Sequence, residues 1–243
     1  MTFWDHLEEL RFVLIRALLA VTLCSVAAFL LGDDLFKILL APTHSEFLTY
    51  RLIDAPADFR INLVNTGLTE QFFVHLRTAF YVGILFSSPY IIYVVAKFVA
   101  PGLYQREKVL ALQLVCASYV MFLIGTLVNF FFVFPLTVRF LGTYQVSPEV
   151  SNMLTLQSYT DTLLGLGLVM GLVFELPVVC FFLSRTGLLT IDVMRRYRRH
   201  TFVAILVVAA VITPTGDPFS LFIVSLPIYL LYELSILVIS KTG

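Results

Sequence analysis

The chain has 243 residues, of which 59% are hydrophobic and only 13% are charged, and its mean hydropathy is +0.94. A water-soluble domain of this length could not bury so much apolar surface, so the composition predicts a polytopic membrane protein. The formal net charge is zero, which excludes a general attraction to nucleic acid and leaves any charge-dependent function to local clusters.

Six apolar segments are candidates for membrane helices, since a hydrocarbon core of about 30 Å needs about 20 helical residues. They are Phe12–Leu31, Phe72–Ala96, Val109–Phe134, Thr162–Leu183, Thr201–Ile212 and Phe219–Ser240. The fifth segment would reach only about 18 Å at about 1.5 Å per residue, too little for an unperturbed bilayer. We predict an all-α fold of six transmembrane helices, with short helices five and six, in a single integral membrane domain over residues 1–243.

The stretch "TPTGDP" joins the last two apolar segments. Asp217 can serve as the N-cap of helix six, because its carboxylate accepts hydrogen bonds from the free backbone N–H groups of the first turn. Pro218 can be the first helical residue, because that position needs no backbone N–H group. Helices five and six are therefore predicted to form a tight antiparallel hairpin. The sixth apolar segment also contains a proline, Pro227, and an acidic residue, Glu233.

The basic residues predict the orientation of the chain. Most of the sixteen Lys and Arg residues fall on one side of the six segments, namely Arg11, Arg16, Lys97, Arg106, Lys108, Arg185, Arg195, Arg196, Arg198, Arg199 and Lys241. The other side has Lys37, Arg51, Arg60, Arg77 and Arg139. Cytoplasmic loops carry the excess of Lys and Arg, so both termini are predicted to be cytoplasmic.

Two long outer loops follow from this orientation, roughly Gly32–Gln71 and Pro135–Asp161. Both are partly apolar. Stretches such as "DDLFKILLAP" indicate short amphipathic helices lying at the outer interface.

Three carboxylates, Asp5, Glu8 and Glu9, precede the first apolar segment, where a cytoplasmic flank more often has Lys or Arg. Acidic residues in a first helical turn offset the positive end of the helix dipole, and Thr2 with Asp5 resembles a capping box. That explanation suits Asp5 and Glu8 best. It is weaker for Glu9, which is further along the helix and adjoins the membrane.

A further carboxylate, Glu107, lies in the loop between helices two and three, after the helix-breaking pair Pro101-Gly102. By itself it is best explained by a local salt bridge with Arg106 or Lys108. The residues alone do not identify Glu9 and Glu107 as a pair.

Several stretches taken together resemble the TatC family, the multispanning core of the twin-arginine protein translocase. They are "HLEELR", "SSPYIIYVVAKFVAPGLYQREK", "FELP", "RRYRRH", "TPTGDPFS" and "LPIYLLYELS". The resemblance covers nearly the whole chain, in the same order and with six helices. The chain departs from the family at Leu221, where the family often has Gln, and "TPTGDP" is one residue longer than the commoner turn.

The resemblance implies that Glu9 and Glu107 form the cytoplasmic docking site for the arginine pair of a signal peptide, with Phe98 and Arg11 beside it. A guanidinium presents a planar fork that a carboxylate can bind through two hydrogen bonds, whereas a lysine ammonium keeps only the charge. Two carboxylates can therefore select two arginines.

Two acids lie within apolar segments, Glu175 in the fourth and Glu233 in the sixth. A carboxylate there is costly unless it is protonated, hydrated or hydrogen-bonded. For Glu175, an interhelical hydrogen bond and a place in the wall that a signal peptide or partner helix contacts remain open, the latter by resemblance. For Glu233 the structural interpretation is favoured.

Further positions have weaker signals. The resemblance places Pro42 and Glu70 in an outer cap of short helices, although a turn proline and a helix-start acid explain them equally well. The basic run Arg195, Arg196, Arg198 and Arg199 is most simply a topology anchor that binds anionic headgroups. The three cysteines lie in separate apolar segments, which does not suggest a disulfide or metal framework.

No phosphate loop, metalloprotease motif or nucleophile elbow occurs, so we predict no enzymatic activity, cofactor or metal. By resemblance, the proton gradient drives transport in a bacterial cytoplasmic membrane, and single-helix TatA- and TatB-type subunits assemble on a core that is itself homo-oligomeric. One alternative is a proton-coupled small-solute transporter that uses Glu175, although the chain lacks an inverted repeat. Another is a membrane scaffold without cargo recognition.

Overall fold

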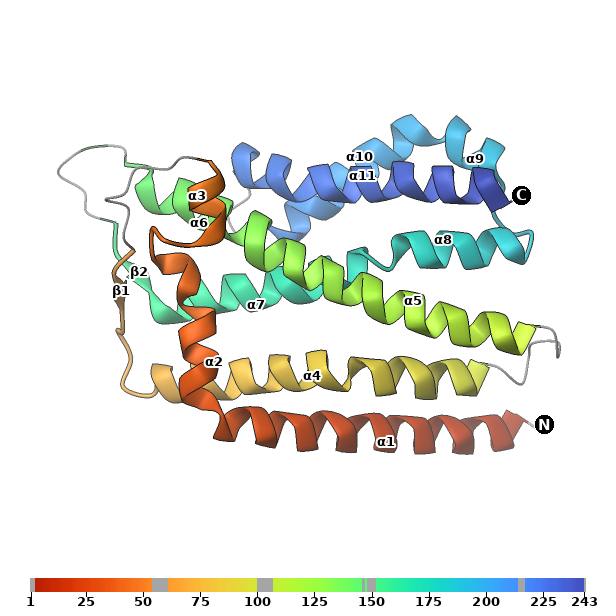
Figure 1. Cartoon of the computed structure of the whole chain (residues 1–243), viewed down its shortest axis with the longest axis horizontal. Coiled ribbons are helices and arrows are strands. Elements are labelled where there is room, and N and C mark those ends of the chain that lie inside the picture. Colours follow the sequence, from red (N-terminus) through yellow and green to blue (C-terminus); the bar gives the residue numbers. More distant parts are fainter. Residues whose placement is uncertain are drawn as a thin grey trace. The chain divides into compact units, whose positions relative to one another are not determined.

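The computed structural model describes residues 3–53, 61–99, 107–145, 147, 152–213 and 217–242 (Figure 1). Its helices are α1 (Phe3–Leu30), α2 (Gly32–Leu39), α3 (Leu48–Leu52), α4 (Glu70–Val99), α5 (Glu107–Val128), α6 (Phe134–Thr143), α7 (Leu156–Val173), α8 (Leu176–Arg185), α9 (Ile191–Arg196), α10 (Arg198–Ile212) and α11 (Pro218–Thr242). A 3-10 turn (Ala41–Thr43), a π-helical turn (Asn129–Val133) and the two-residue strands β1 (Leu63–Val64) and β2 (Leu154–Thr155) complete the described elements.

The fold is mostly helical, as predicted, and its contacts divide it into two compact units. The first comprises residues 1–41 and 65–120, and the second comprises residues 42–64 and 121–243. The single integral membrane domain over residues 1–243 stays a prediction.

Five helical stretches among the described residues are long and apolar enough to cross a membrane. They are Leu7–Leu30, Glu70–Val95, Leu114–Thr143, Leu156–Arg185 and Pro218–Ser240. The protein is therefore a multi-pass membrane protein. The helix α10 has 15 residues, about 22 Å of length, so the prediction that helix five is short is confirmed. The count of six spans and the cytoplasmic termini stay predictions.

The prediction of a short helix six is wrong, since α11 has 25 residues and continues through Pro227. Transmembrane helices tolerate proline because neighbouring groups satisfy the freed carbonyl. Asp217 Oδ2 accepts a hydrogen bond from Ser220 N at 2.7 Å, and Pro218 is the first residue of α11. The predicted capping of this helix is therefore confirmed.

The predicted outer loop Pro135–Asp161 is too wide. Pro135 lies in the first turn of α6, where its missing N–H costs little, so the helical path runs to Thr143. The next helix begins at Leu156 because the Thr155 hydroxyl caps it, accepting from Ser158 N at 3.1 Å. The amphipathic helix expected in "DDLFKILLAP" is present as α2.

In the first unit, α1 and α4 form the most extensive helix pair. They approach closely at Ser25 and Gly83, where a Cβ atom on Gly83 would lie 2.8 Å from the Ser25 backbone nitrogen. His75 of α4 holds the corner between α1 and α2. Its Nε2 lies 3.1 Å from Phe29 O, and its ring stacks on Phe29 with centroids 4.1 Å apart. This histidine in an apolar segment thus has a structural role.

A large apolar core in the second unit is made of Val133, Leu166, Met170, Phe174, Ile205, Ala209, Val224, Ile228 and Leu231. These side chains come from the π-helical turn, α7, α10 and α11 and from the link between α7 and α8. At the other end of the unit, β1 and β2 pair in parallel, with Leu63 opposite Leu154. The pairing joins two segments that are far apart in sequence.

Tyr50 of α3 ties the short outer elements to α6. It is 1% exposed, and its hydroxyl lies 2.9 Å from Pro42 O and 3.2 Å from Pro135 O, to which it can donate. Burial raises the pKa of Tyr50, so its phenol stays neutral and able to donate.

We expect Tyr50→Phe to lower the free energy of unfolding by about 1 to 3 kcal/mol, because buried carbonyls lose their donor. Thermal unfolding in detergent, followed by circular dichroism, measures the change. Tyr144→Phe is the matched control, since Tyr144 is 62% exposed. Equal melting temperatures for the two variants would contradict this role for Tyr50.

Candidate functional site

The first unit brings three helix ends together, because α1 begins, α4 ends and α5 begins at the same end of the unit (Figure 1). Glu9 lies near the start of α1, Phe98 near the end of α4, and Glu107 is the first residue of α5. The elements that carry the predicted docking residues therefore converge on one end.

Glu9 is the residue of this group with the most informative surroundings. Its side chain is half-buried, and its Oε2 atom is fully buried without a hydrogen-bond partner in the part of the chain that the structure describes. The neighbouring Glu8 is exposed. A buried carboxylate oxygen that lacks a donor is unfavourable, and an incoming N–H donor would relieve that cost.

The other predicted members are only partly defined. Phe98 is half-buried in the last turn of α4. Arg11 is exposed, and the helical period turns it away from Glu9. The side chain of Glu107 lies outside the described residues, so the pairing of Glu9 with Glu107 stays a prediction.

Glu175 lies within the span Leu156–Arg185, which agrees with the predicted fourth membrane helix over Thr162–Leu183. Inside this span a two-residue turn at Phe174 and Glu175 breaks the α-helix, and Glu175 is the residue that precedes α8. Pro177 explains the break, because its ring removes an N–H and clashes with the carbonyl of Val173 four positions earlier. The half-buried Glu175 side chain thus belongs to the positive end of the α8 dipole, which favours a negative charge.

The contacts of Glu233 agree with the structural interpretation favoured from the sequence. Its Oε2 accepts from Arg198 Nη2 at 2.7 Å, and its Oε1 accepts from the Tyr229 hydroxyl at 3.1 Å. The ion pair joins the first residue of α10 to α11. It therefore fixes the start of the short helix.

We expect a double-mutant cycle of Arg198→Gln and Glu233→Gln to give a coupling energy of about 1 kcal/mol. The value is modest because the two side chains are 46% and 27% exposed. Chemical unfolding of the four proteins in mild detergent measures it. Strictly additive effects would show that the pair does not hold α10.

The outer-cap residues make local contacts. Glu70 Oε2 accepts from the backbone nitrogens of Thr66 and Gly67, both at 2.9 Å, and thus closes the turn before α4. Pro42 is buried, and Tyr50 lies within hydrogen-bond distance of its carbonyl. These contacts support the structural explanation for both residues.

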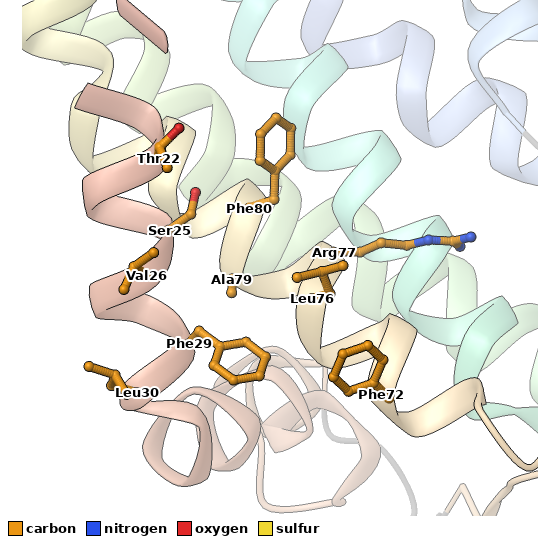
Figure 2. Close-up of a pocket in the computed structure, with 10 residues that line it drawn as sticks. All are labelled: Thr22, Ser25, Val26, Phe29, Leu30, Phe72, Leu76, Arg77, Ala79 and Phe80. Carbon is orange, nitrogen blue, oxygen red and sulfur yellow. The ribbon is translucent and has the colours of Figure 1, made fainter. Parts of the chain in front are cut away.

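The sequence did not point to a cavity of about 610 Å³ between α1 and α4 (Figure 2). Val26 and Phe29 of α1 line one side, while Phe72, Leu76 and Phe80 of α4 line the other. Arg77 points away from α1 in Figure 2. The cavity is apolar, and it begins at Thr22, about 20 Å along α1 from Glu9. It therefore lies apart from the predicted docking residues, and its apolar lining favours a hydrocarbon group.

A buried amide was also missed. Asn129 is 1% exposed in the π-helical turn, and its Nδ2 donates to Leu163 O at 3.2 Å. The available signal was an amide deep inside the charge-free segment Val109–Phe134, whose other amide, Gln113, lies near its start. Single-turn π segments inside helices are frequent at functional sites.

Comparisons with known proteins agree with the motifs. The family described as Sec-independent protein translocase protein (TatC) matches residues 5–227. The TatC protein of Blattabacterium is 30% identical over 97% of this chain and 94% of its own length. The TatCy protein of Bacillus subtilis is 32% identical over 98% of this chain and 92% of its own.

Solved structures agree as well. A crystal structure of the twin-arginine translocase receptor TatC in DDM superposes with a TM-score of 0.80, at 29% identity and over 96% of this chain and 98% of that one. A second TatC receptor structure gives a TM-score of 0.79. The family model, the relatives and the solved structures all match nearly the whole chain. The chain therefore belongs to the TatC family of Sec-independent protein translocase subunits.

Proposed function

We propose that this protein is the core receptor subunit of a twin-arginine translocase in a bacterial cytoplasmic membrane. It binds the signal peptide of folded cargo at the cytoplasmic face and nucleates assembly of the translocation site. The observation that supports the proposal is the buried Oε2 atom of Glu9, which has no hydrogen-bond partner among the described residues and lies at the end of the first unit where α1, α4 and α5 have their termini.

The chemistry of that atom suits an arginine. A guanidinium offers parallel N–H donors that can satisfy both oxygens of a carboxylate, and an ammonium cannot reproduce this geometry. Glu9 takes one arginine of the pair and Glu107 the other. Phe98 supplies an apolar wall beside them.

The proposed topology has six membrane helices with both termini in the cytoplasm, α10 being the fifth helix. It rests on the excess of Lys and Arg on one side. In this orientation Glu9 and Glu107 belong to the cytoplasmic face, where an exported protein is first met.

The partners in this proposal are TatA- and TatB-type single-helix subunits and further copies of this chain. The proton gradient is the energy source. The hairpin of α10 and α11 is their lateral docking face. Phe222, Leu226 and Leu230 of α11 are spaced by four residues and are 62%, 48% and 59% exposed, which provides an apolar stripe for a partner helix.

Binding of a labelled signal peptide to the purified protein tests the receptor function. A peptide with Arg-Arg is expected to bind more than about tenfold more tightly than the same peptide with Lys-Lys, since a charged hydrogen bond contributes about 1.5 to 3 kcal/mol. Fluorescence anisotropy in detergent gives both affinities. Equal affinities would remove the receptor assignment.

A further inference from the structure

The helices α9 and α10 both pack against α11, and the chain bends between them. Met194 of α9 is 3% exposed and packs with Ile236 and Ile239 of α11, and the Tyr232 hydroxyl donates to Met194 O at 2.7 Å. Tyr197 then ends α9, and α10 begins at Arg198. Figure 1 shows α9 beside the C-terminal end of α11.

The ion pair between Arg198 and Glu233 shows where the bend lies along α11. Arg198 is bound to Glu233, which lies inside the candidate span Pro218–Ser240. The end of α11 at Thr242 is nine residues further along, about 14 Å at 1.5 Å per residue. When the candidate span crosses a bilayer, long arginine side chains at the bend reach the lipid headgroups, and the apolar side chains beside them reach the first acyl carbons.

The bend has a strong excess of positive charge. Arg195, Arg196, Arg198 and Arg199 are all exposed. The carboxylate of Glu233 compensates Arg198. The other three arginines have no ion pair within the part of the chain that the structure describes, and the one acid of α9 is the exposed Asp192.

Apolar side chains continue from the arginines along α10. Phe202, Val203 and Val207 are 45%, 58% and 58% exposed. Arg199 therefore lies next to this apolar stripe on α10, and Arg195 and Arg196 end α9 directly before it. This order matches a phospholipid, whose phosphate is anionic and whose acyl chains are apolar.

We propose that the corner between α9 and α10 is a binding site for an anionic phospholipid. Arg195, Arg196 and Arg199 hold the phosphate, and an acyl chain lies along Phe202, Val203 and Val207. Zwitterionic lipids bind weakly because their own ammonium group offsets the phosphate. The ion pair of Arg198 with Glu233 keeps the corner in place and takes no part in lipid binding.

The test measures binding of phosphatidylglycerol to the purified full chain in phosphatidylcholine nanodiscs, by native mass spectrometry of the retained lipid. The variant R195Q/R196Q/R199Q is expected to bind about 100-fold more weakly, because each basic residue near an anionic surface contributes a factor of about five. The variant R195K/R196K/R199K keeps the charge and is expected to stay within a few-fold of the parent.

Arg51→Gln is the matched control, since Arg51 is an exposed arginine on α3 and its loss should leave lipid binding unchanged. Arg198 is kept in every variant so that α10 stays anchored. The proposal is overturned if the glutamine variant binds like the parent, if the lysine variant loses as much as the glutamine variant, or if phosphatidylcholine binds equally well. Displacement of the lipid by millimolar inorganic phosphate would point to a free-anion site and would also overturn it.

Discussion

Glu9→Ala is expected to weaken binding of a twin-arginine signal peptide by about 2 to 5 kcal/mol, a factor of about 30 to several thousand. The magnitude depends on burial. A fully exposed ion pair contributes at most about 1 kcal/mol, which is too little to select one peptide sequence. Because Oε2 of Glu9 is buried, the pair is partly removed from water, and truncation strands the partner arginine.

The adjacent acid provides the control for this experiment. Glu8 carries the same charge on the same helix but is exposed, so Glu8→Ala should change peptide affinity by less than about 1 kcal/mol. Glu9→Gln keeps the shape of the side chain and removes its charge, and it should lose most of what the alanine variant loses. Equal losses for the Glu8 and Glu9 variants would mean that only bulk charge attracts the peptide.

A double-mutant cycle of Glu9→Ala and Glu107→Ala in the same peptide-binding measurement tests the role of Glu107. If each acid holds one arginine of the pair, Glu107→Ala alone should lose about as much as Glu9→Ala alone. The double variant should lose less than the sum, because residues that serve one ligand act as a unit. Independent, additive losses would separate the two acids into different sites.

The membrane helices could largely be predicted from sequence, because hydropathy reports which side chains avoid water. The places where these helices are interrupted could not be predicted from hydropathy. Pro135 indicated a loop, yet in the first turn of α6 it lacks only a donor that is free anyway. Conversely, hydropathy predicted the fourth membrane helix through Glu175 and Pro177 but not the turn inside it, which the backbone effect of the proline introduces between α7 and α8.

The candidate site was predictable only in part. The helix-dipole explanation was weaker for Glu9 than for Asp5 and Glu8, but position along the helix did not say what Glu9 binds. The family resemblance selected Glu9, and the structure adds the burial of its Oε2 atom. Burial of one oxygen depends on how helices pack, which residue order along α1 does not report. The apolar cavity between α1 and α4 escaped prediction for the same reason.

Gly125→Ala is expected to destabilise the second unit, since α5 and α7 are closely packed at this position. A Cβ atom on Gly125 would lie 2.6 Å from Met170 O and 2.8 Å from Phe174 Cβ. The first of these neighbours is backbone and cannot rotate away. The two helices must therefore separate, and overpacking of this kind costs about 1 to 3 kcal/mol.

A second glycine, Gly165 of α7, provides the control for this experiment. Gly165 has nothing within 4 Å of the position that its Cβ would take, so Gly165→Ala adds a methyl group to open space. Alanine is also the better helix former, by up to about 1 kcal/mol. The control should leave stability unchanged or raise it slightly.

Thermal unfolding in detergent compares the two glycine variants with the parent. For a chain of this size, about 1 kcal/mol shifts the melting temperature by about 2 to 4 °C, so Gly125→Ala should melt several degrees below the parent. Because Met170 and Phe174 belong to the core that also includes Ala209 of α10 and Val224 of α11, separation of α5 from α7 should loosen the α10–α11 hairpin as well. Faster hydrogen exchange in α10 of the Gly125 variant would reveal that coupling, whereas equal melting of both glycine variants would show that α5 can shift freely.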